Sequence, residues 1–338
     1  MTEADISGVT LTAIRARSDT LRPNLLRTPS IMLSSQYISE RLNGSEIFLK
    51  LECFQHTGTF KARGALSVAL QIPDANRANG ITAASAGNHA IAASWAAKTL
   101  DLSAKVVMQS SANPYRISRV KAQGAELVIK EPGAPTFAEA ERLVHQENRT
   151  FIHPFEGLDT SLGTAGVGLE LMEDIPRLDA VVVSCGGGGL ISGVSTAVKL
   201  INPDCKVYGV EPEGADSMNQ SFASGRPVTL EKTNTIADSL APPMALPLGF
   251  ALCKKYVDEM VRVSDAEICA GMVMLQEEAK IAVEPAAGAA MAGALGPLRE
   301  RLSKQRVGIV ICGANIDSTT FHDLLSRGQM FIDRSPKY

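Results

Sequence analysis

Four consecutive glycines in the segment Ser184–Leu190 give the strongest chemical signal in the sequence. They follow a β-branched run typical of a buried strand and come directly before an apolar helical pattern. Consecutive glycines let backbone N–H groups approach an anion closely, and a helix N-terminus adds positive potential. The dinucleotide pattern GxGxxG fails here in every register. The segment therefore predicts a site for a single phosphate group rather than for a pyrophosphate.

A lysine lies at the start of a helical pattern in a second segment, Gly58–Ala65. Phe60 and the small neighbours leave little polar cover, which makes Lys61 a candidate for burial. Burial lowers the pKa of a lysine, and its neutral amine attacks carbonyl groups. A solvated lysine is the usual alternative, and this motif alone does not decide between the two.

Two further segments, Ser85–Ala90 and Cys312–Asn315, also follow strand-like runs. Ser85 and Gly87 suit a helix start whose backbone N–H groups meet a carboxylate, although an ordinary N-cap is the alternative. Cys312 follows a predicted strand, and open α/β sheets bind ligands at the carboxyl ends of their strands. A buried cysteine with a purely structural role is the more common alternative. Together the four segments supply an amine, a phosphate cradle, a carboxylate site and a weakly polar ring partner. A phosphorylated aldehyde cofactor joined to an amino acid requires that set.

Short β-branched runs alternate with longer helical patterns, which predicts an α/β fold with parallel sheets and right-handed crossovers. All predicted strands except the first are continuous apolar runs, which indicates burial on both faces. The predicted strands are 47–51, 81–84, 104–108, 126–129, 180–184, 206–210 and 307–311. The predicted helices are 61–72, 88–99, 114–123, 136–147, 164–174, 190–200, 266–279 and 286–302. The polar, weakly periodic segment 217–247 predicts irregular surface structure.

Composition and charge exclude several classes of protein. The 338 residues include 33 Lys and Arg against 36 Asp and Glu, a net charge of −3 without a basic cluster, which argues against nucleic-acid binding. No apolar run reaches the roughly 18 residues of a membrane span, and the first ten residues do not resemble a signal peptide. The six cysteines form no CxxC pair, which disfavours a structural zinc site and predicts a reducing, cytoplasmic location.

The motifs TFKARGA, SAGNHA, SCGGGGL, EPAAGAA and ICGAN, in this order and spacing, resemble those of the fold-type-II pyridoxal-phosphate enzymes. Within that family the sequence resembles the threonine/serine dehydratase and serine racemase branch, over about residues 27–317. The resemblance implies a two-lobed fold of the tryptophan synthase beta-like kind. We expect a large cofactor-binding domain of residues 1–72 and 156–338, and a small mobile domain of residues 73–155 that closes over the substrate. It also implies a homodimer.

The resemblance implies a role for each motif. Lys61 is expected to be the catalytic residue, carrying pyridoxal 5'-phosphate as a Schiff base and moving the Cα proton of the substrate. The other expected cofactor-binding residues are Phe60 behind the ring, Asn88 at the ring hydroxyl, Gly186, Gly187, Gly188, Gly189 and Leu190 at the phosphate, Glu284 near the ring and Cys312 at the pyridine nitrogen. The expected substrate-binding residues are Ser85, Ala86, Gly87, Asn88 and His89.

The implied reaction converts a β-hydroxy-α-amino acid, by default L-threonine or L-serine, to a 2-keto acid and ammonia. A neutral thiol at Cys312 supplies no negative charge to the ring, which favours β-elimination over racemisation. In relatives that racemise, the position of Ala86 resembles a serine hydroxyl on the face opposite the lysine. Alanine offers no acid or base there, so we expect racemase activity to be absent or slight.

Other functions stay open at this level. A dehydratase for 3-hydroxyaspartate or for an intermediate of hydroxyectoine breakdown requires a cation inside the site, and Arg63 is a candidate. Tyr115, Arg116 and Arg119 are further candidates for substrate choice, although surface charge is the favoured interpretation of their segment. A serine racemase, a β-replacement synthase and a non-catalytic binder of small anions or partner proteins are the remaining alternatives.

Some relatives hold a divalent cation in the segment that resembles Glu211–Ser217. Glu211 and the carbonyl of Ala215 match their pattern, and oxygen ligands suit Mg²⁺ or Ca²⁺. Ser217 departs from it, because it stands where a second acid is expected. Asp216 is adjacent, but a shift by one residue changes the direction of its side chain. Solvated acids are therefore the favoured interpretation.

Overall fold

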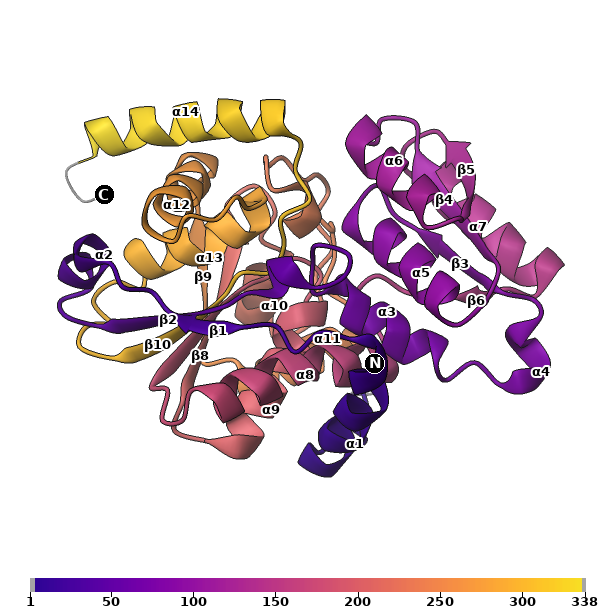
Figure 1. The fold of residues 1–338 in the computed structure, drawn as a ribbon, viewed down its shortest axis with the longest axis horizontal. Coiled ribbons are helices and arrows are strands. Elements are labelled where there is room, and N and C mark those ends of the chain that lie inside the picture. Colours follow the sequence, from indigo (N-terminus) through magenta and orange to yellow (C-terminus); the bar gives the residue numbers. More distant parts are fainter. Residues whose placement is uncertain (1–3, 336–338) are drawn as a thin grey trace.

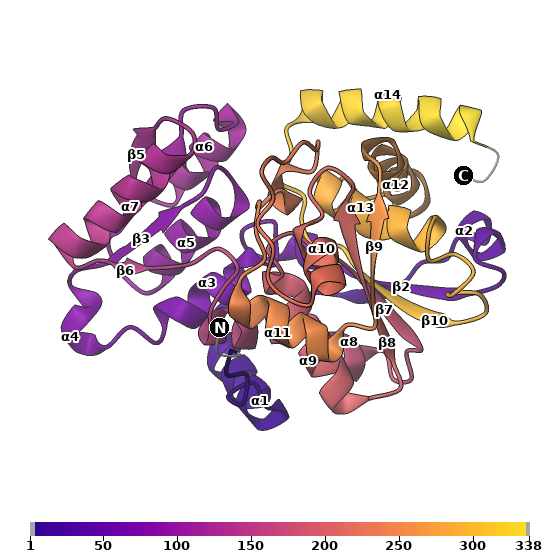
Figure 2. The ribbon, with the colours of Figure 1, turned by 180° about the vertical axis from the view of Figure 1, so that it is seen from behind.

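Two sheets organise the protein, which is described here by a computed structural model for residues 4–335. Figures 1 and 2 show the sheets side by side, each flanked by helices. The six-stranded sheet has the order β1 (Ser30–Met32), β2 (Glu46–Lys50), β10 (Arg306–Val310), β7 (Ala180–Ser184), β8 (Lys206–Pro212) and β9 (Glu259–Val263). The four-stranded sheet has the order β5 (Glu126–Lys130), β4 (Ala104–Gln109), β3 (Ile81–Ala84) and β6 (Thr150–Phe151).

The helices lie mostly between successive strands of the chain. They are α1 (Leu11–Leu21), α2 (Gln36–Arg41), α3 (Lys61–Ala69), α4 (Asp74–Arg77), α5 (Asn88–Thr99), α6 (Pro114–Ala122), α7 (Ala134–Glu147), α8 (Leu158–Asp174), α9 (Gly189–Ile201), α10 (Ser217–Ser224), α11 (Pro247–Tyr256), α12 (Asp265–Glu278), α13 (Pro285–Leu295) and α14 (Ser318–Arg334). Helices α13 and α9 pack against the central strands of the larger sheet from opposite faces (Figure 1). None of the helices in the described part of the chain is long and apolar enough to cross a membrane.

The predicted α/β class with parallel sheets is confirmed. Only the pair β1–β2 is antiparallel among the strand pairs within residues 4–335, and all the others are parallel. Every predicted strand and helix is present, although the helix predicted from residue 164 begins at Leu158 and the one predicted to 302 ends at Leu295. Parallel strands require crossovers, and the alternation of strand and helix patterns reflects this requirement.

Two expectations about these elements are wrong. Strand β5 is not buried on both faces, because it is the edge strand of the smaller sheet and its residues are exposed or half-buried. The segment 217–247 is not simply irregular surface. It contains α10 and a 3₁₀ turn at Asp238–Leu240, and it buries Met218 and Leu240.

The two sheets come from different parts of the chain. All strands of the smaller sheet lie between Ile81 and Phe151, and all strands of the larger sheet lie outside that range. The expected domain boundaries at residues 72/73 and 155/156 stay a prediction, and the terminal residues 1–3 and 336–338 of the expected large domain lie outside the described residues.

Candidate active site

The edge of the larger sheet where parallel strands end brings two motifs together. Strands β7 and β10 are parallel neighbours, so the glycine segment after Ser184 and the Cys312 segment leave the sheet at the same edge. The hydroxyl of Ser184 donates a hydrogen bond to Cys312 Sγ at 3.4 Å. Burial raises the pKa of the Cys312 thiol far above its ordinary value, so the thiol is neutral. The thiol therefore offers a neutral polar group at the floor of the site.

Backbone contacts hold Lys61 beside Cys312. Phe60 N donates to Cys312 O at 3.1 Å, and Thr59 forms an isolated β-bridge with Gly313. Lys61 begins α3, and its Nζ donates to Pro154 O at 2.5 Å. Burial lowers the pKa of the Lys61 amine to about 8, although the nearby Glu284 carboxyl acts in the opposite direction. The amine is therefore much closer to neutrality at physiological pH than a solvated lysine.

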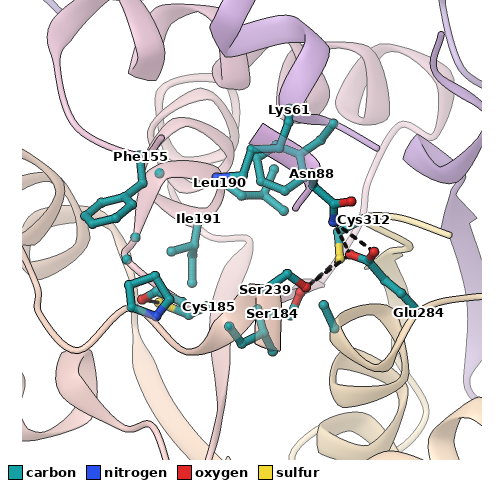
Figure 3. A pocket seen from close by; sticks show the side chains of 18 residues that line it. Lys61, Asn88, Phe155, Ser184, Cys185, Leu190, Ile191, Ser239, Glu284 and Cys312 are labelled. Carbon is teal, nitrogen blue, oxygen red and sulfur yellow. Dashed lines mark hydrogen bonds between the residues drawn. The ribbon is translucent and has the colours of Figure 1, made fainter. Parts of the chain in front are cut away.

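A pocket opens between these segments (Figure 3). It contains residues predicted from the sequence: Phe60, Lys61, Asn88, Gly186, Gly187, Gly188, Gly189, Leu190, Glu284 and Cys312. It is also lined by residues for which the sequence predicts no role: Phe155, Ser184, Cys185, Ile191, Ser239, Leu240, Pro242 and Ala286. The lysine and the tetraglycine turn, which are distant in the chain, thus share one pocket.

The tetraglycine turn leaves no space for side chains. Gly188 has a φ of +89° and is the N-cap of α9, a conformation that favours glycine. A Cβ on Gly187 would lie 2.5 Å from the ring of Phe155, and one on Gly189 would lie 2.6 Å from the Phe155 Cα. A backbone cradle at a helix N-terminus fits a phosphate group, as the sequence predicts.

Asn88 and Glu284 line the pocket together with the tetraglycine turn. The Asn88 amide donates to both carboxylate oxygens of Glu284 at 2.8 Å, as Figure 3 shows, and Ser239 Oγ donates to the same carboxylate at 3.2 Å. Asn315 Nδ2 donates to Asn88 Oδ1 at 2.9 Å and to Thr57 O at 2.8 Å. Burial raises the pKa of Glu284. These contacts fix the orientation of the Asn88 amide. The sequence does not predict that Asn315 positions Asn88, because a motif does not show where a side chain points.

The expected substrate-binding residues are only partly gathered here. Asn88 lines the pocket, whereas the three residues before it in the chain, Ser85, Ala86 and Gly87, do not. Ser85 Oγ accepts a hydrogen bond from Gly87 N at 3.1 Å. His89 borders a smaller neighbouring pocket that also contains Lys61. The His89 Nε2 lies 2.7 Å from Ile152 O, and burial together with the Lys61 charge lowers its pKa to about 3. His89 is therefore neutral and turned toward the Ile152 carbonyl.

The structure contradicts the expected locations of Arg63 and Arg116. Arg63 is not inside the site, because its buried guanidinium pairs with Glu52 and Glu170 at 2.8 Å. The surface-charge interpretation is wrong for Arg116, which is buried and forms an ion pair with Asp238. It holds for Arg119, which is exposed.

The interpretation of the Glu211 segment as solvated acids is wrong, because Glu211 and Asp216 are both buried. The Glu211 carboxylate accepts from Met218 N at 2.9 Å and Asn219 N at 2.7 Å, and burial raises its pKa to about 8. Asp216 points elsewhere and pairs with Arg262 at 3.1 Å. Ser217 Oγ is buried without a hydrogen-bond partner. Within residues 4–335 no group of three or more His, Cys, Asp or Glu side chains could hold a metal ion.

We expect the substitution Ser217→Asp to raise the affinity of the Glu211 segment for a divalent cation. A second carboxylate beside Glu211 supplies the charge that Mg²⁺ or Ca²⁺ requires. Millimolar Mg²⁺ or Ca²⁺ should raise the Tm of the variant by about 3 °C and that of the natural protein by less than about 1 °C. If chelation removed the activity of the natural protein and Mg²⁺ restored it, this account of the Glu211 segment would be wrong.

Comparisons with known proteins agree with this geometry. A family model described as pyridoxal-phosphate dependent enzyme matches residues 22–313. Phenylserine dehydratase from Ralstonia pickettii is 47% identical over 86% of this chain and 89% of its own length. L-threonine ammonia-lyase from Thermotoga maritima is 37% identical over 95% of this chain and 79% of its own length. The structure of maize serine racemase aligns with a TM-score of 0.89 at 32% identity, covering 95% of this chain and 98% of that one.

The lysine, the phosphate cradle and the two-sheet fold define a class, and the chain belongs to the family of pyridoxal-phosphate dependent enzymes, of fold type II. Within that family it is a lyase, a dehydratase or ammonia-lyase that converts a β-hydroxy-α-amino acid to a 2-keto acid and ammonia. The non-catalytic alternative is thereby excluded.

We expect the protein freed of cofactor to capture pyridoxal 5'-phosphate faster as the pH rises through about 8, because the neutral form of Lys61 attacks the aldehyde. Stopped-flow absorbance between about pH 6.5 and pH 10.5 measures this rate. A midpoint near the ordinary lysine value of 10.5 would show that the amine is solvated instead.

Proposed function

We propose that Lys61 carries the cofactor and exchanges the Cα proton of a β-hydroxy-α-amino acid, with phenylserine a better substrate than threonine or serine. The observation that carries the proposal is the half-buried Lys61, whose amine has a lowered pKa and which shares one pocket with the tetraglycine turn. The relative named for phenylserine supports the substrate, since its identity is 47%, whereas two relatives named for threonine are 37% and 38% identical. Leu240, Pro242 and Phe155 give the pocket an apolar side that suits an aromatic ring.

The groups that line the pocket have different roles in the proposed reaction. Pyridoxal 5'-phosphate, once bound, withdraws electrons from the Cα atom of the amino acid joined to it. The backbone N–H groups of Gly186–Gly189 would hold its phosphate, and the neutral Cys312 thiol would face its ring nitrogen. Lys61, when released from the aldehyde, can take the Cα proton in its neutral form, which the lowered pKa favours. The contact of its Nζ with the Pro154 carbonyl is a resting place for that amine.

A panel of substrates tests the proposal. Phenylserine, threonine, serine and both 3-hydroxyaspartate diastereomers are incubated with the loaded enzyme, and the keto acids are trapped. We expect kcat/KM for phenylserine to exceed that for threonine by about tenfold or more, because burial of a ring adds binding energy. An equal or higher value for threonine would overturn the aromatic preference. Parallel assays with a thiol nucleophile separate elimination from β-replacement.

Racemisation is expected to be slight, because Ala86 has no acid or base. Its methyl group packs with the apolar cluster that contains Ala90 and Ile91. L-serine should give D-serine at less than about 1% of the rate of pyruvate formation, and Ala86→Ser should raise that fraction. Chiral chromatography of the products measures both. D-serine formation at a rate near that of pyruvate would contradict the expectation.

We also propose that the protein is a cytoplasmic homodimer whose residues 73–155 form a small mobile domain. Leu26, Ile31, Met32 and Phe54 support the dimer, because these large apolar side chains are exposed on or near the edge strand β1. The six described cysteines, all buried and free, suit a reducing compartment. Sedimentation velocity of the natural chain and of Met32→Glu tests the dimer, since a charge at this position should favour the monomer.

A further inference from the structure

A smaller pocket adjoins the one that contains the tetraglycine turn, and Lys61 lines both. The smaller pocket is also lined by His89 at the start of α5, His153 after strand β6 and Thr160 in the first turn of α8. Its volume of about 10 Å³ is far too small for a substrate or a cofactor. A cavity of this size with polar walls suits roughly one or two water molecules.

The hydroxyl of Thr160 is the first observation that points to a bound water molecule. Thr160 is only 4% exposed, and its Oγ1 has no hydrogen-bond partner among residues 4–335. Thr164, one turn further along α8 and in the same pocket, differs, because its Oγ1 donates to Gly189 O at 2.7 Å. A buried hydroxyl without a partner costs free energy. Thr160 therefore requires a hydrogen-bond partner that the pocket beside it can hold.

Two histidines of the smaller pocket have tautomers that backbone groups fix. His153 Nδ1 accepts from Phe155 N at 3.2 Å and from Glu156 N at 2.9 Å, so the ring proton lies on Nε2. His89 Nε2 donates to Ile152 O at 2.7 Å, so His89 Nδ1 carries no proton. Burial lowers the pKa of the two rings to about 4 and about 3, and both are therefore neutral. One ring offers a donor and the other an acceptor, and a bound water molecule uses both.

The amine of Lys61 requires a second acceptor. A neutral amine has two N–H groups and one lone pair, and Pro154 O accepts one of these N–H groups at 2.5 Å. An acceptor in the smaller pocket for the other N–H group leaves the lone pair free for the Cα proton in the larger pocket. The same acceptor stabilises the ammonium form, whose N–H groups all require partners once water is excluded.

We propose that the smaller pocket binds a water molecule that accepts an N–H group of Lys61 and thereby orients the amine. Thr160, His89 and His153 hold this water molecule, and they are positioning residues because they act on Lys61 through it. The inference rests on the proposed function, since it takes Lys61 as the base for the Cα proton.

Removal of the Thr160 hydroxyl tests the proposal. Thr160→Val keeps the shape of the side chain without the hydroxyl, and Thr160→Ser keeps the hydroxyl. Thr82→Val is the matched control. Thr82 is also a buried threonine whose hydroxyl has no hydrogen-bond partner in the described part of the chain, but it lies on β3 and does not line the smaller pocket.

Crystal structures of the cofactor-free proteins give the most direct readout. We expect an ordered water molecule within about 3.2 Å of Lys61 Nζ and of Thr160 Oγ1 in the natural chain. The water molecule should persist in Thr160→Ser and Thr82→Val and be lost from Thr160→Val. A smaller pocket without water in the natural chain would overturn the proposal.

The kinetics should separate orientation of the base from binding of the substrate. We expect Thr160→Val to lower kcat by about 10-fold and to change KM by less than about threefold, because only the direction of the amine is disturbed. Thr160→Ser should restore most of kcat, and Thr82→Val should behave like the natural chain. Equal losses of kcat in Thr160→Val and Thr82→Val would show that the hydroxyl acts through packing alone and would contradict the proposal.

Capture of pyridoxal 5'-phosphate by the cofactor-free protein gives a third readout, which does not depend on turnover. Loss of an acceptor destabilises the ammonium form of Lys61, so the pH midpoint of capture in Thr160→Val should fall by about 0.5 to 1 pH unit. The other titratable groups around Lys61 are unchanged in this variant: Glu284, the neutral thiol of Cys312 and the neutral rings of His89 and His153. An unchanged or higher midpoint would contradict the proposal.

The outcomes separate this inference from the proposed function. If the natural enzyme formed no keto acid from any member of the panel, the proposed function would fail, and the crystal structures would still decide whether the water molecule is bound. If the enzyme formed keto acid but no water molecule contacted Lys61 in the smaller pocket, only this inference would fail.

Discussion

Replacement of Lys61 by alanine is expected to lower kcat/KM for ammonia release by about 10⁴-fold or more. The substitution removes the amine of low pKa that shares one pocket with the tetraglycine turn. It deletes both the covalent anchor of the cofactor and the base that takes the Cα proton, so the two losses combine. Ammonia release from the best substrate of the panel, followed with an excess of pyridoxal 5'-phosphate, gives the measurement.

The control for this substitution is Lys121→Ala, which removes an exposed lysine from the last turn of α6. It should leave kcat/KM within about twofold, as is usual for surface substitutions. If Lys61→Ala kept more than about 1% of the natural activity while its Tm stayed unchanged, another group would be the base, and the account of Lys61 would be wrong.

Gly189→Ala is expected to weaken the binding of pyridoxal 5'-phosphate by about 100-fold, because each lost charge-assisted contact to a phosphate costs roughly 1.5–3 kcal/mol. The new Cβ would lie 2.6 Å from Phe155 Cα and 2.8 Å from Phe155 O, and backbone atoms cannot rotate away. The start of α9 must therefore move, and the N–H groups of the cradle move with it. Titration of the cofactor-free protein, followed by absorbance, measures the affinity.

Two further variants make this test specific. Gly187→Ala meets the ring of Phe155 instead of its backbone, at 2.5 Å, so the added substitution Phe155→Ala should restore much of its affinity but none to Gly189→Ala. Gly8→Ala is the control, since its Cβ would meet only the side chain of Leu158, at 3.1 Å. Unchanged cofactor affinity in Gly189→Ala would show that the turn does not hold the phosphate.

The elements that the sequence predicts well are those with a strong local pattern. The run Ala180–Ser184 is apolar because β7 is central and fully buried, and the glycines that follow it mark the end of the strand. Strand β9 (Glu259–Val263) was missed because it is an edge strand with charged residues at two positions. Helix α10 was missed because it is short and mostly polar, although it buries Met218.

The site was predictable where its residues belong to motifs and unpredictable where distant segments meet. Asn88 and Glu284 were each expected near the ring, but their mutual hydrogen bonds join residues 196 positions apart. Arg116 looks like surface charge because its partner Asp238 is 122 residues away in the chain. Ser239 lies in a segment without periodicity, and only the packing of that segment against Gly186 brings it to the pocket. Pairing across sheets leaves no local signal in the sequence.

The most direct test of the account is to find where the cofactor is attached. The loaded protein is reduced with borohydride, which makes the bond between amine and aldehyde permanent, and is then digested and analysed by mass spectrometry. We expect the pyridoxyl group on the peptide that contains Lys61, with the fluorescence of the label absent from Lys61→Ala. A label on another lysine of the natural protein, or none at all after full loading, would contradict the assignment of Lys61.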